Sequence, residues 1–154
     1  MQIKKIISGG QTGVDRVALD IALDLGIPCG GWCPKGRKAE DGRIDSRYPL
    51  METSSGTYRV RTGRNVRESD GTLVITRGKP REGTALTIKV AQKYGKPFLV
   101  VDLSLEKNPT TAERWMDTKG IQILNIAGPR ESQTPGIYKE ASQFLRAMFK
   151  DQKR

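Results

Sequence analysis

The chain has 154 residues, a length typical of one domain. Its 27 Lys and Arg against 17 Asp and Glu give a formal net charge of +10, which favours anionic partners, and the absence of His excludes a histidine base, a His-containing triad and a His-bearing zinc site. No apolar run approaches the ~18 residues of a membrane span, so we expect no membrane partner. The N-terminus lacks a signal peptide's features and two cysteines make no disulfide framework, so we expect a cytoplasmic protein.

The first strand, loop and helix form the clearest unit of the sequence. Residues 3–7 read as an apolar strand, and the glycine-rich loop 8–13 follows it. The apolar positions of the next segment recur at helical spacing, at Val14, Val17, Ala18, Ile21, Ala22 and Leu25. Gly26 supplies the helix stop, and Pro28 lies just beyond it. Residues 27–32 predict a second, short strand.

The segment from residue 33 to residue 56 is polar, rich in turn residues and without a clear period. A long irregular stretch of this kind is uncommon in a compact domain unless it is a binding loop or lid, so we expect a binding loop here. After it, the sequence predicts a short edge strand over 57–61 and a brief helix over 62–68.

The second half alternates strands and helices. Residues 72–76 predict a central strand, 77–83 a second glycine-bearing loop, and Thr84 is placed to cap a helix that runs to residue 94. Strands over 98–103 and 121–126 flank a helix ending at Gly120, and a final helix opens at 134–135. This alternation predicts an α/β fold with an open parallel sheet, in a single domain spanning 1–154.

Three of the strand-to-helix junctions carry glycine together with Thr, Gln or Arg: residues 9–13, 78–84 and 128–135. In an open parallel sheet such junctions gather at the carboxyl edge, where unpaired N–H groups of helix N-termini attract anions. Each loop alone could be an unliganded tight turn, but three together predict an anion site. The candidate ligand-binding residues in them are Gly9, Gly10, Gln11, Thr12, Gly13, Gly83, Thr84 and Gly128.

Charged residues near these junctions have two interpretations each. Asp15 either complements the dipole and cap of the first helix or accepts a hydrogen bond from a ligand. The loop 34–42 is either a solvated, salt-bridged loop or a cationic flap over a phosphate, with Lys35 and Arg37 as its best candidates. Cys29 and Cys33 have poor spacing for zinc, so no metal ligands are assigned, and no catalytic residue is assigned either.

Familiar nucleotide motifs are incomplete here. Ser8 occupies the place of the first glycine of a dinucleotide fingerprint, and no acidic residue closes the second strand, which disfavours NAD. Residues 78–84 have the glycine spacing of a P-loop, but Thr84 stands where its lysine is required.

Several segments, in order along nearly the whole chain, resemble the molybdenum-cofactor carrier proteins. The segments that carry the resemblance lie at residues 8–16, 31–37, 39–42, 48–50, 61–62, 65–66, 69–73, 83–84 and 127–132. The resemblance implies a Rossmann-like, three-layer fold of the SLOG superfamily, shared with LOG-type phosphoribohydrolases and the DNA-processing protein DprA. It also implies a homo-oligomer such as a tetramer.

The same resemblance implies a ligand and roles for individual residues. Molybdenum cofactor is a pterin that carries a phosphate and an anionic metal–oxygen group. By position, residues 9–13 and 83–84 would hold the phosphate, and Lys35, Arg37 and Arg130 would be supporting cations.

The leading interpretation is therefore a non-enzymatic carrier of a phosphorylated pterin or another nucleotide-like anion. The alternative is a nucleotide-processing hydrolase of the LOG type, but Thr87 occupies the place of the LOG glutamate, so hydrolysis would need Glu82 or Glu131 instead. Nucleic-acid binding ranks last, because aromatic residues are few and the cations are dispersed.

Overall fold

The computed structural model describes residues 2–152 and has a five-stranded sheet at its centre. The strand order is β2-β1-β9-β7-β8, and every neighbouring pair is parallel. The strands are β1 (Lys5–Ile7), β2 (Cys29–Gly30), β7 (Gly71–Thr76), β8 (Phe98–Asp102) and β9 (Ile123–Ala127). The predicted parallel α/β fold is confirmed, with β7 in the sheet interior as expected.

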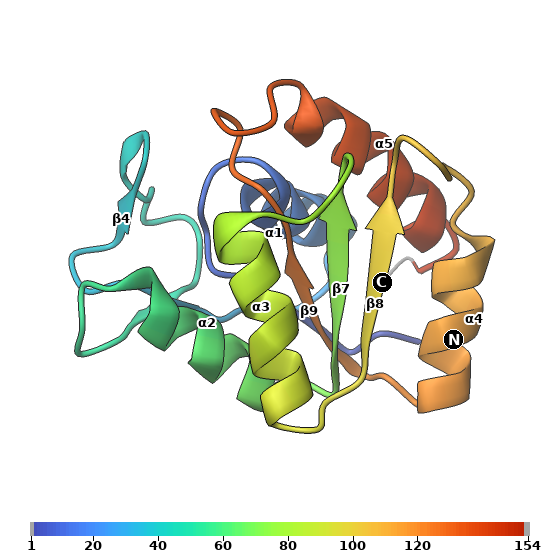
Figure 1. Ribbon diagram of the computed structural model, residues 1–154, viewed down its shortest axis with the longest axis horizontal. Helices are drawn as coiled ribbons and strands as arrows, with labels where there is room; N and C mark the ends of the chain where they lie inside the picture. Colours follow the sequence, from blue (N-terminus) through green and yellow to red (C-terminus); the bar gives the residue numbers. More distant parts are fainter. Residues whose placement is uncertain (1, 153–154) are drawn as a thin grey trace.

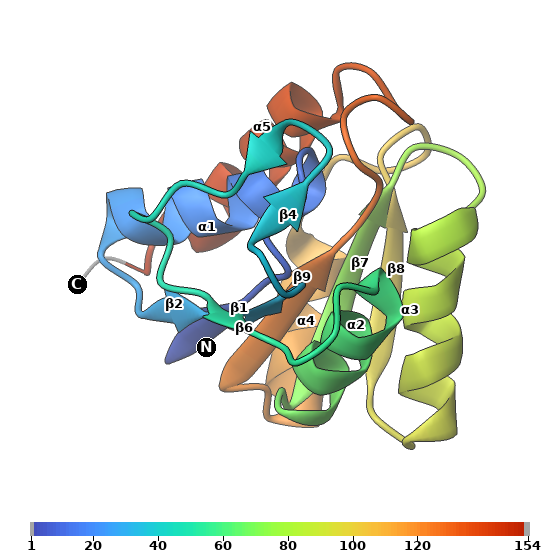
Figure 2. The ribbon, with the colours of Figure 1, turned by 90° about the vertical axis from the view of Figure 1, so that its left-hand side faces the viewer.

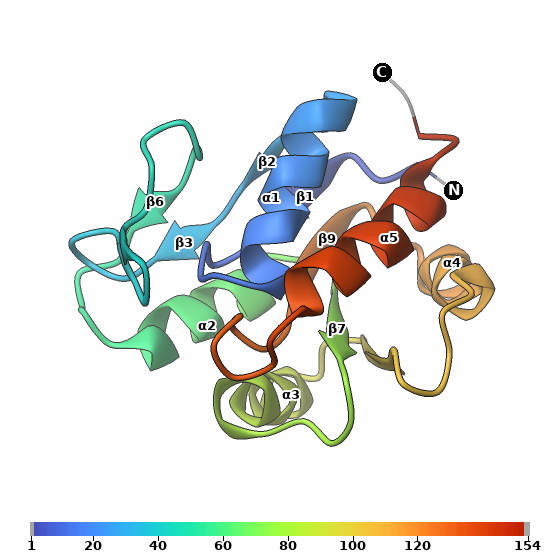
Figure 3. The same ribbon diagram turned by 90° about the horizontal axis from the view of Figure 1, so that it is seen from above.

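Helices cover both faces of the sheet and complete a Rossmann-like, three-layer arrangement (Figure 1). One face carries α1 (Val14–Leu25), α4 (Thr110–Lys119) and α5 (Ile137–Phe149), while α2 (Tyr58–Arg67) and α3 (Glu82–Lys93) cover the other, as seen from above in Figure 3. The predicted stops are present, because Gly26 and Gly120 both adopt the left-handed conformation that ends a helix.

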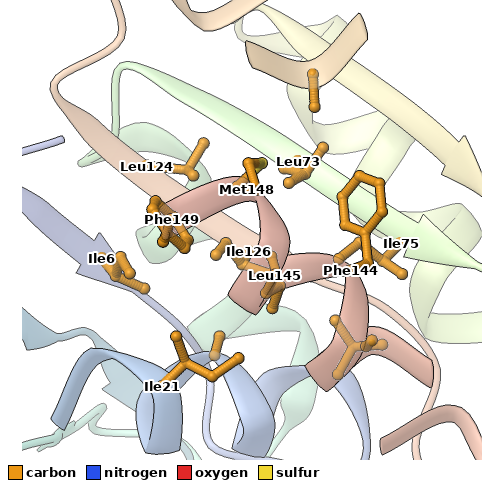
Figure 4. Packing of buried hydrophobic residues seen from close by; sticks show 14 of the residues in the cluster. Ile6, Ile21, Leu73, Ile75, Leu124, Ile126, Phe144, Leu145, Met148 and Phe149 are labelled. Carbon is orange, nitrogen blue, oxygen red and sulfur yellow. The ribbon is translucent and has the colours of Figure 1, made fainter. Parts of the chain in front are cut away.

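The main hydrophobic core lies between the sheet and the α1–α5 layer (Figure 4). Ile6 and Ile126 point from adjacent strands, and Leu145 meets them from α5; all three side chains are fully buried. Each such burial stabilises the fold by roughly 1.5–3 kcal/mol. The regularly spaced apolar residues of α1 and α5 therefore pack against the sheet in one continuous core.

The last strand, β9, lies between β1 and β7 rather than at an edge. Its residues pair with β1 on one side and with β7 on the other, for example Leu124 with Ile6 and Ile126 with Leu73. Because all three strands are parallel, the loops that follow them leave from the same edge of the sheet. This topology brings together segments more than 100 residues apart.

Two sequence predictions for the first half are wrong. Residues 57–61 are not a strand, because α2 begins at Tyr58. The Asn65 side chain anchors this helix: it accepts a hydrogen bond from the Trp32 N–H and donates one to the Trp32 carbonyl. The expected strand 27–32 is broken at Gly31, whose φ is +128°. After this turn, β3 (Trp32–Cys33) leaves the main sheet and pairs with β6 (Met51–Glu52).

The segment 33–56 is less irregular than expected. It contains a small hairpin of β4 (Lys38–Ala39) and β5 (Gly42–Arg43), which stands to the side of the main sheet (Figures 1 and 2). Its own apolar cluster includes Ile44 and Tyr48, packed with Leu19 of α1. Across residues 2–152, no helix is long and apolar enough to span a membrane.

Candidate anion-binding site

A pocket of about 80 Å³ opens at the carboxyl edge, between β9 and the helices α2 and α3. It is lined by parts of all three glycine-bearing junctions, as the sequence predicts. The lining residues are Gly9, Gln11, Asp15, Tyr58, Arg61, Thr62, Asn65, Gly83, Thr84, Leu86, Thr87, Asn125, Ile126, Ala127, Gly128, Pro129, Arg130 and Gln133. Five of these residues are predicted from the junctions, one, Asp15, from the first helix, and one, Arg130, from the family resemblance.

Asp15 supplies a buried carboxylate to this pocket. Only 6% of the residue is exposed, and it is the acidic residue in the first turn of α1, whose N-cap, Gly13, makes no side-chain hydrogen bond. Burial raises the pKa of the Asp15 carboxyl from its ordinary 3.8 to about 6, while Arg61 and the N–H groups of Gln11 and Gly128 offset part of that rise. The loop N–H groups that could bind an external anion are therefore already directed at the Asp15 carboxylate.

Arg61 of α2 is the residue that the sequence interpretation missed. Its Nη1 donates to the Gly9 carbonyl at 2.8 Å and lies 3.4 Å from Asp15 Oδ2, with 11% of the side chain exposed. A Cβ on Gly9 would lie 2.0 Å from Arg61 Nη1, so this glycine makes room for the guanidinium. The expectation of a strand over 57–61 hid this arginine, although it falls within the segments of family resemblance.

Thr84 brings an unsatisfied hydroxyl to the pocket wall. Contrary to the prediction, it does not cap α3: the helix begins at Glu82, and the Thr84 N–H bonds to the Arg81 carbonyl at 3.1 Å, within the first turn. Thr84 is 4% exposed, and its Oγ1 is buried without a hydrogen-bond partner. Because a buried hydroxyl left unpaired is costly, this atom marks a place where a ligand acceptor fits.

Aromatic and cationic groups extend from the pocket on the α2 side. The half-buried Tyr58 ring lies on the pocket wall, with the Arg61 guanidinium 5.3 Å and the Lys38 ammonium 5.6 Å from its centre. Arg130 also lines the pocket. The site thus combines a helix N-terminus, several cations and one aromatic face, which suits a flat ring that bears a phosphate.

Three predicted residues of the first loop lie outside the pocket lining and have structural roles. Gly10 packs beneath Leu50, which a Cβ would approach to 2.5 Å. The Thr12 hydroxyl donates to Glu40 and also accepts the Glu131 N–H at 3.1 Å. At Gly13, φ is +79° and a Cβ would lie 2.3 Å from the Pro129 carbonyl oxygen. Thr12 and Gly13 thus hold the first junction against the third, whereas Gly10 holds it against the segment 44–50.

The two cations predicted for a flap are not brought to the pocket. Lys35 is exposed and away from the lining. Arg37 is only 7% exposed, and its guanidinium donates to four backbone carbonyls, those of Ile44, Asp45, Tyr48 and Leu50. All of those acceptors belong to the segment 44–50, so Arg37 holds that loop in shape.

Gly128 offers a test of how tightly the site is assembled. A Cβ there would lie 2.3 Å from the Ile75 carbonyl oxygen and 2.6 Å from Val14 Cγ2. We expect Gly128→Ala to lower the free energy of unfolding by about 2 kcal/mol, as overpacking does, measured by urea denaturation. Gly63→Ala, where a Cβ meets nothing within 4 Å in a helix interior, is the control and should be neutral or stabilising. Equal effects would show that the junction tolerates the added methyl.

Comparison with known proteins agrees with this architecture. Residues 6–149 match the sequence pattern of the circularly permutated YpsA SLOG family. The chain belongs to this family. It is also 47% identical to a crystal structure from Syntrophus aciditrophicus SB named "Putative molybdenum carrier protein", with a TM-score of 0.92 over 95% of this chain and 94% of the other. No curated protein gives a significant match.

In this SLOG chain the two acids considered for hydrolysis lie outside the pocket lining. Glu131 accepts the N–H groups of Gly136 and Tyr138 at 2.7 and 2.9 Å, so it caps the start of α5. Glu82 is exposed and accepts a hydrogen bond from the side-chain amide of Gln133. Among residues 2–152, no three Cys, Asp or Glu side chains gather into a set that could hold a metal ion.

Proposed function

We propose that this protein binds and carries a phosphorylated ring compound, with the phosphorylated pterin of molybdenum cofactor as the leading cargo and other nucleotide-like anions as the wider class. The observation that carries the proposal is the buried, unpaired Thr84 hydroxyl in the first turn of α3, on the pocket wall. The name of the Syntrophus protein, which is 47% identical to this chain, supports the choice of cargo.

The phosphate would lie at the N-terminal end of α3. There the Gly83 N–H belongs to the first turn and has no acceptor within the helix, and the Thr84 hydroxyl can donate to a phosphate oxygen. A volume of about 80 Å³ has room for a few water molecules, and hence for one phosphate group. The ring would then extend outward along the Tyr58 face.

Thr84→Val tests this assignment because the two side chains have nearly the same shape. We expect the affinity for guanosine 5′-monophosphate, whose base shares the aminopyrimidinone edge of a pterin, to fall about tenfold or more in calorimetry. Thermal stability should stay the same or rise, since the lost hydroxyl has no protein partner. The control Thr111→Val removes an exposed hydroxyl on α4, outside the pocket lining, so affinity should be retained.

The carrier assignment also has a direct test. Purified protein should bind isolated molybdenum cofactor and nucleoside monophosphates, with inorganic phosphate as a competitor. A wild-type protein that binds none of these ligands would contradict the proposal.

A second candidate function is a nucleotide hydrolase, and Asp15 is the observation that favours it. A pocket carboxyl with a pKa of about 6 has the range of a general acid. Release of free base from nucleoside monophosphates, abolished in Asp15→Asn, would establish hydrolysis. Bound but unchanged nucleotide would leave the carrier function as the better explanation.

A further inference from the structure

A second, smaller hollow adjoins the proposed phosphate position. It is about 10 Å³ in volume and is lined by Arg77, Lys79, Arg81, Pro129, Gln133 and Thr134. Pro129 and Gln133 also line the main pocket, so the two hollows share a wall at the carboxyl edge of the sheet. The second hollow has three cationic side chains in its lining and no acidic one.

The three cations differ in whether they already form hydrogen bonds or ion pairs within the protein. Arg77 is committed to the fold, because its guanidinium donates to the Glu140 carboxylate and to the Pro135 carbonyl. Lys79 and Arg81 are exposed and form no ion pair with any residue in the range 2–152. Two uncompensated charges therefore lie beside the main pocket.

The nearby acid does not neutralise them. Glu82 follows Arg81 in the chain, but its carboxylate accepts from the Gln133 side chain and lies outside the lining of both hollows. Lys79 and Arg81 belong to the segment that leads from β7 into α3. This segment ends at the helix N-terminus where the first phosphate is proposed, so a second anionic group bonded to that phosphate would lie within their reach.

We propose that Lys79 and Arg81 form a second phosphate subsite, and that the preferred ligands of this protein carry a diphosphate, as nucleoside diphosphates and dinucleotide forms of a pterin cofactor do. This inference rests on the proposed function, because it places the second phosphate relative to the first. The hollow is too small to enclose the group and the two cations are exposed, so the interaction weakens as ionic strength rises.

The test compares guanosine 5′-monophosphate with guanosine 5′-diphosphate by calorimetry at low ionic strength without magnesium. We expect the wild type to bind the diphosphate about tenfold more tightly, as two exposed charge contacts allow. Lys79→Ala/Arg81→Ala should remove this preference and leave the monophosphate affinity unchanged. The matched control is Lys89→Ala/Lys93→Ala, which removes two cations from the groove between α2 and α3 and should retain the preference.

The possible outcomes distinguish failure of the second phosphate subsite from failure of the proposed function. Equal affinity of the wild type for the two nucleotides would overturn the subsite, as would an equal loss of preference in both double variants, which would indicate only a general effect of net charge. Failure of the wild type to bind either nucleotide would instead overturn the proposed function.

Discussion

Asp15→Asn should tighten the binding of sulfate about tenfold at pH 7.5, because it removes a buried negative charge from the wall of the proposed anion site. In the wild type, affinity should rise by a similar factor as pH falls from about 7.5 to about 5.5, since the Asp15 carboxyl takes up a proton near pH 6. Sulfate is the probe because it does not titrate in this range. The chain has no histidine to confuse the measurement.

The same carboxyl should appear in the pH dependence of stability. Its pKa is higher in the folded state, about 6 against 3.8, so between these values the folded protein binds more protons than the unfolded chain. Wild-type stability should therefore fall by up to about 3 kcal/mol as pH rises through this window. Asp15→Asn should lack this decrease in urea denaturation series collected across the range.

Asp41→Asn is the control for both measurements. Asp41 is exposed and pairs with Arg16 at 3.0 Å, and this contact lowers the pKa of its carboxyl. Asp41→Asn should therefore bind sulfate with the affinity of the wild type. Weaker sulfate binding in Asp15→Asn would contradict the electrostatic argument and assign Asp15 a direct role in holding the ligand.

Arg37→Ala should produce the largest loss of stability, about 3–5 kcal/mol. The substitution leaves four carbonyl groups of residues 44–50 without their donor and opens a cavity at a buried position. Chemical denaturation measures the loss, and limited proteolysis should cut the segment 44–50 faster.

Lys35→Ala is the natural comparison, since it removes a nearby cation that is exposed. It should change stability by less than about 0.5 kcal/mol. If Arg37→Ala instead kept its stability and lost anion affinity, the flap interpretation of the sequence would be restored.

Local patterns were enough to predict the elements whose interactions are local. The apolar spacing of α1 and its stop at Gly26 could be recognised because one helix face packs on one sheet. Positions of glycine also predicted the three junctions correctly, since close backbone contacts such as that of Gly128 with Ile75 tolerate no side chain.

The missed features depend on partners far away in the chain. The helical state of α2 relies on Asn65 bonding to Trp32, and the burial of Asp15 relies on Arg61 and Gly128. Arg37 shows the same limit at short range: its charge suggested a ligand contact, but the fold of the loop uses all of its donors for backbone carbonyls. Residue type alone cannot distinguish these uses.

The central place of β9 has a consequence for how the protein is made. During synthesis, β1 and β7 emerge from the ribosome before the strand that joins them, so each exposes an unpaired edge until residues 123–127 appear. The pocket floor formed by Asn125, Ile126 and Ala127 is then also missing. A chain truncated before β9 therefore lacks part of the pocket lining, and the pocket can form only after residues 123–127 have been translated.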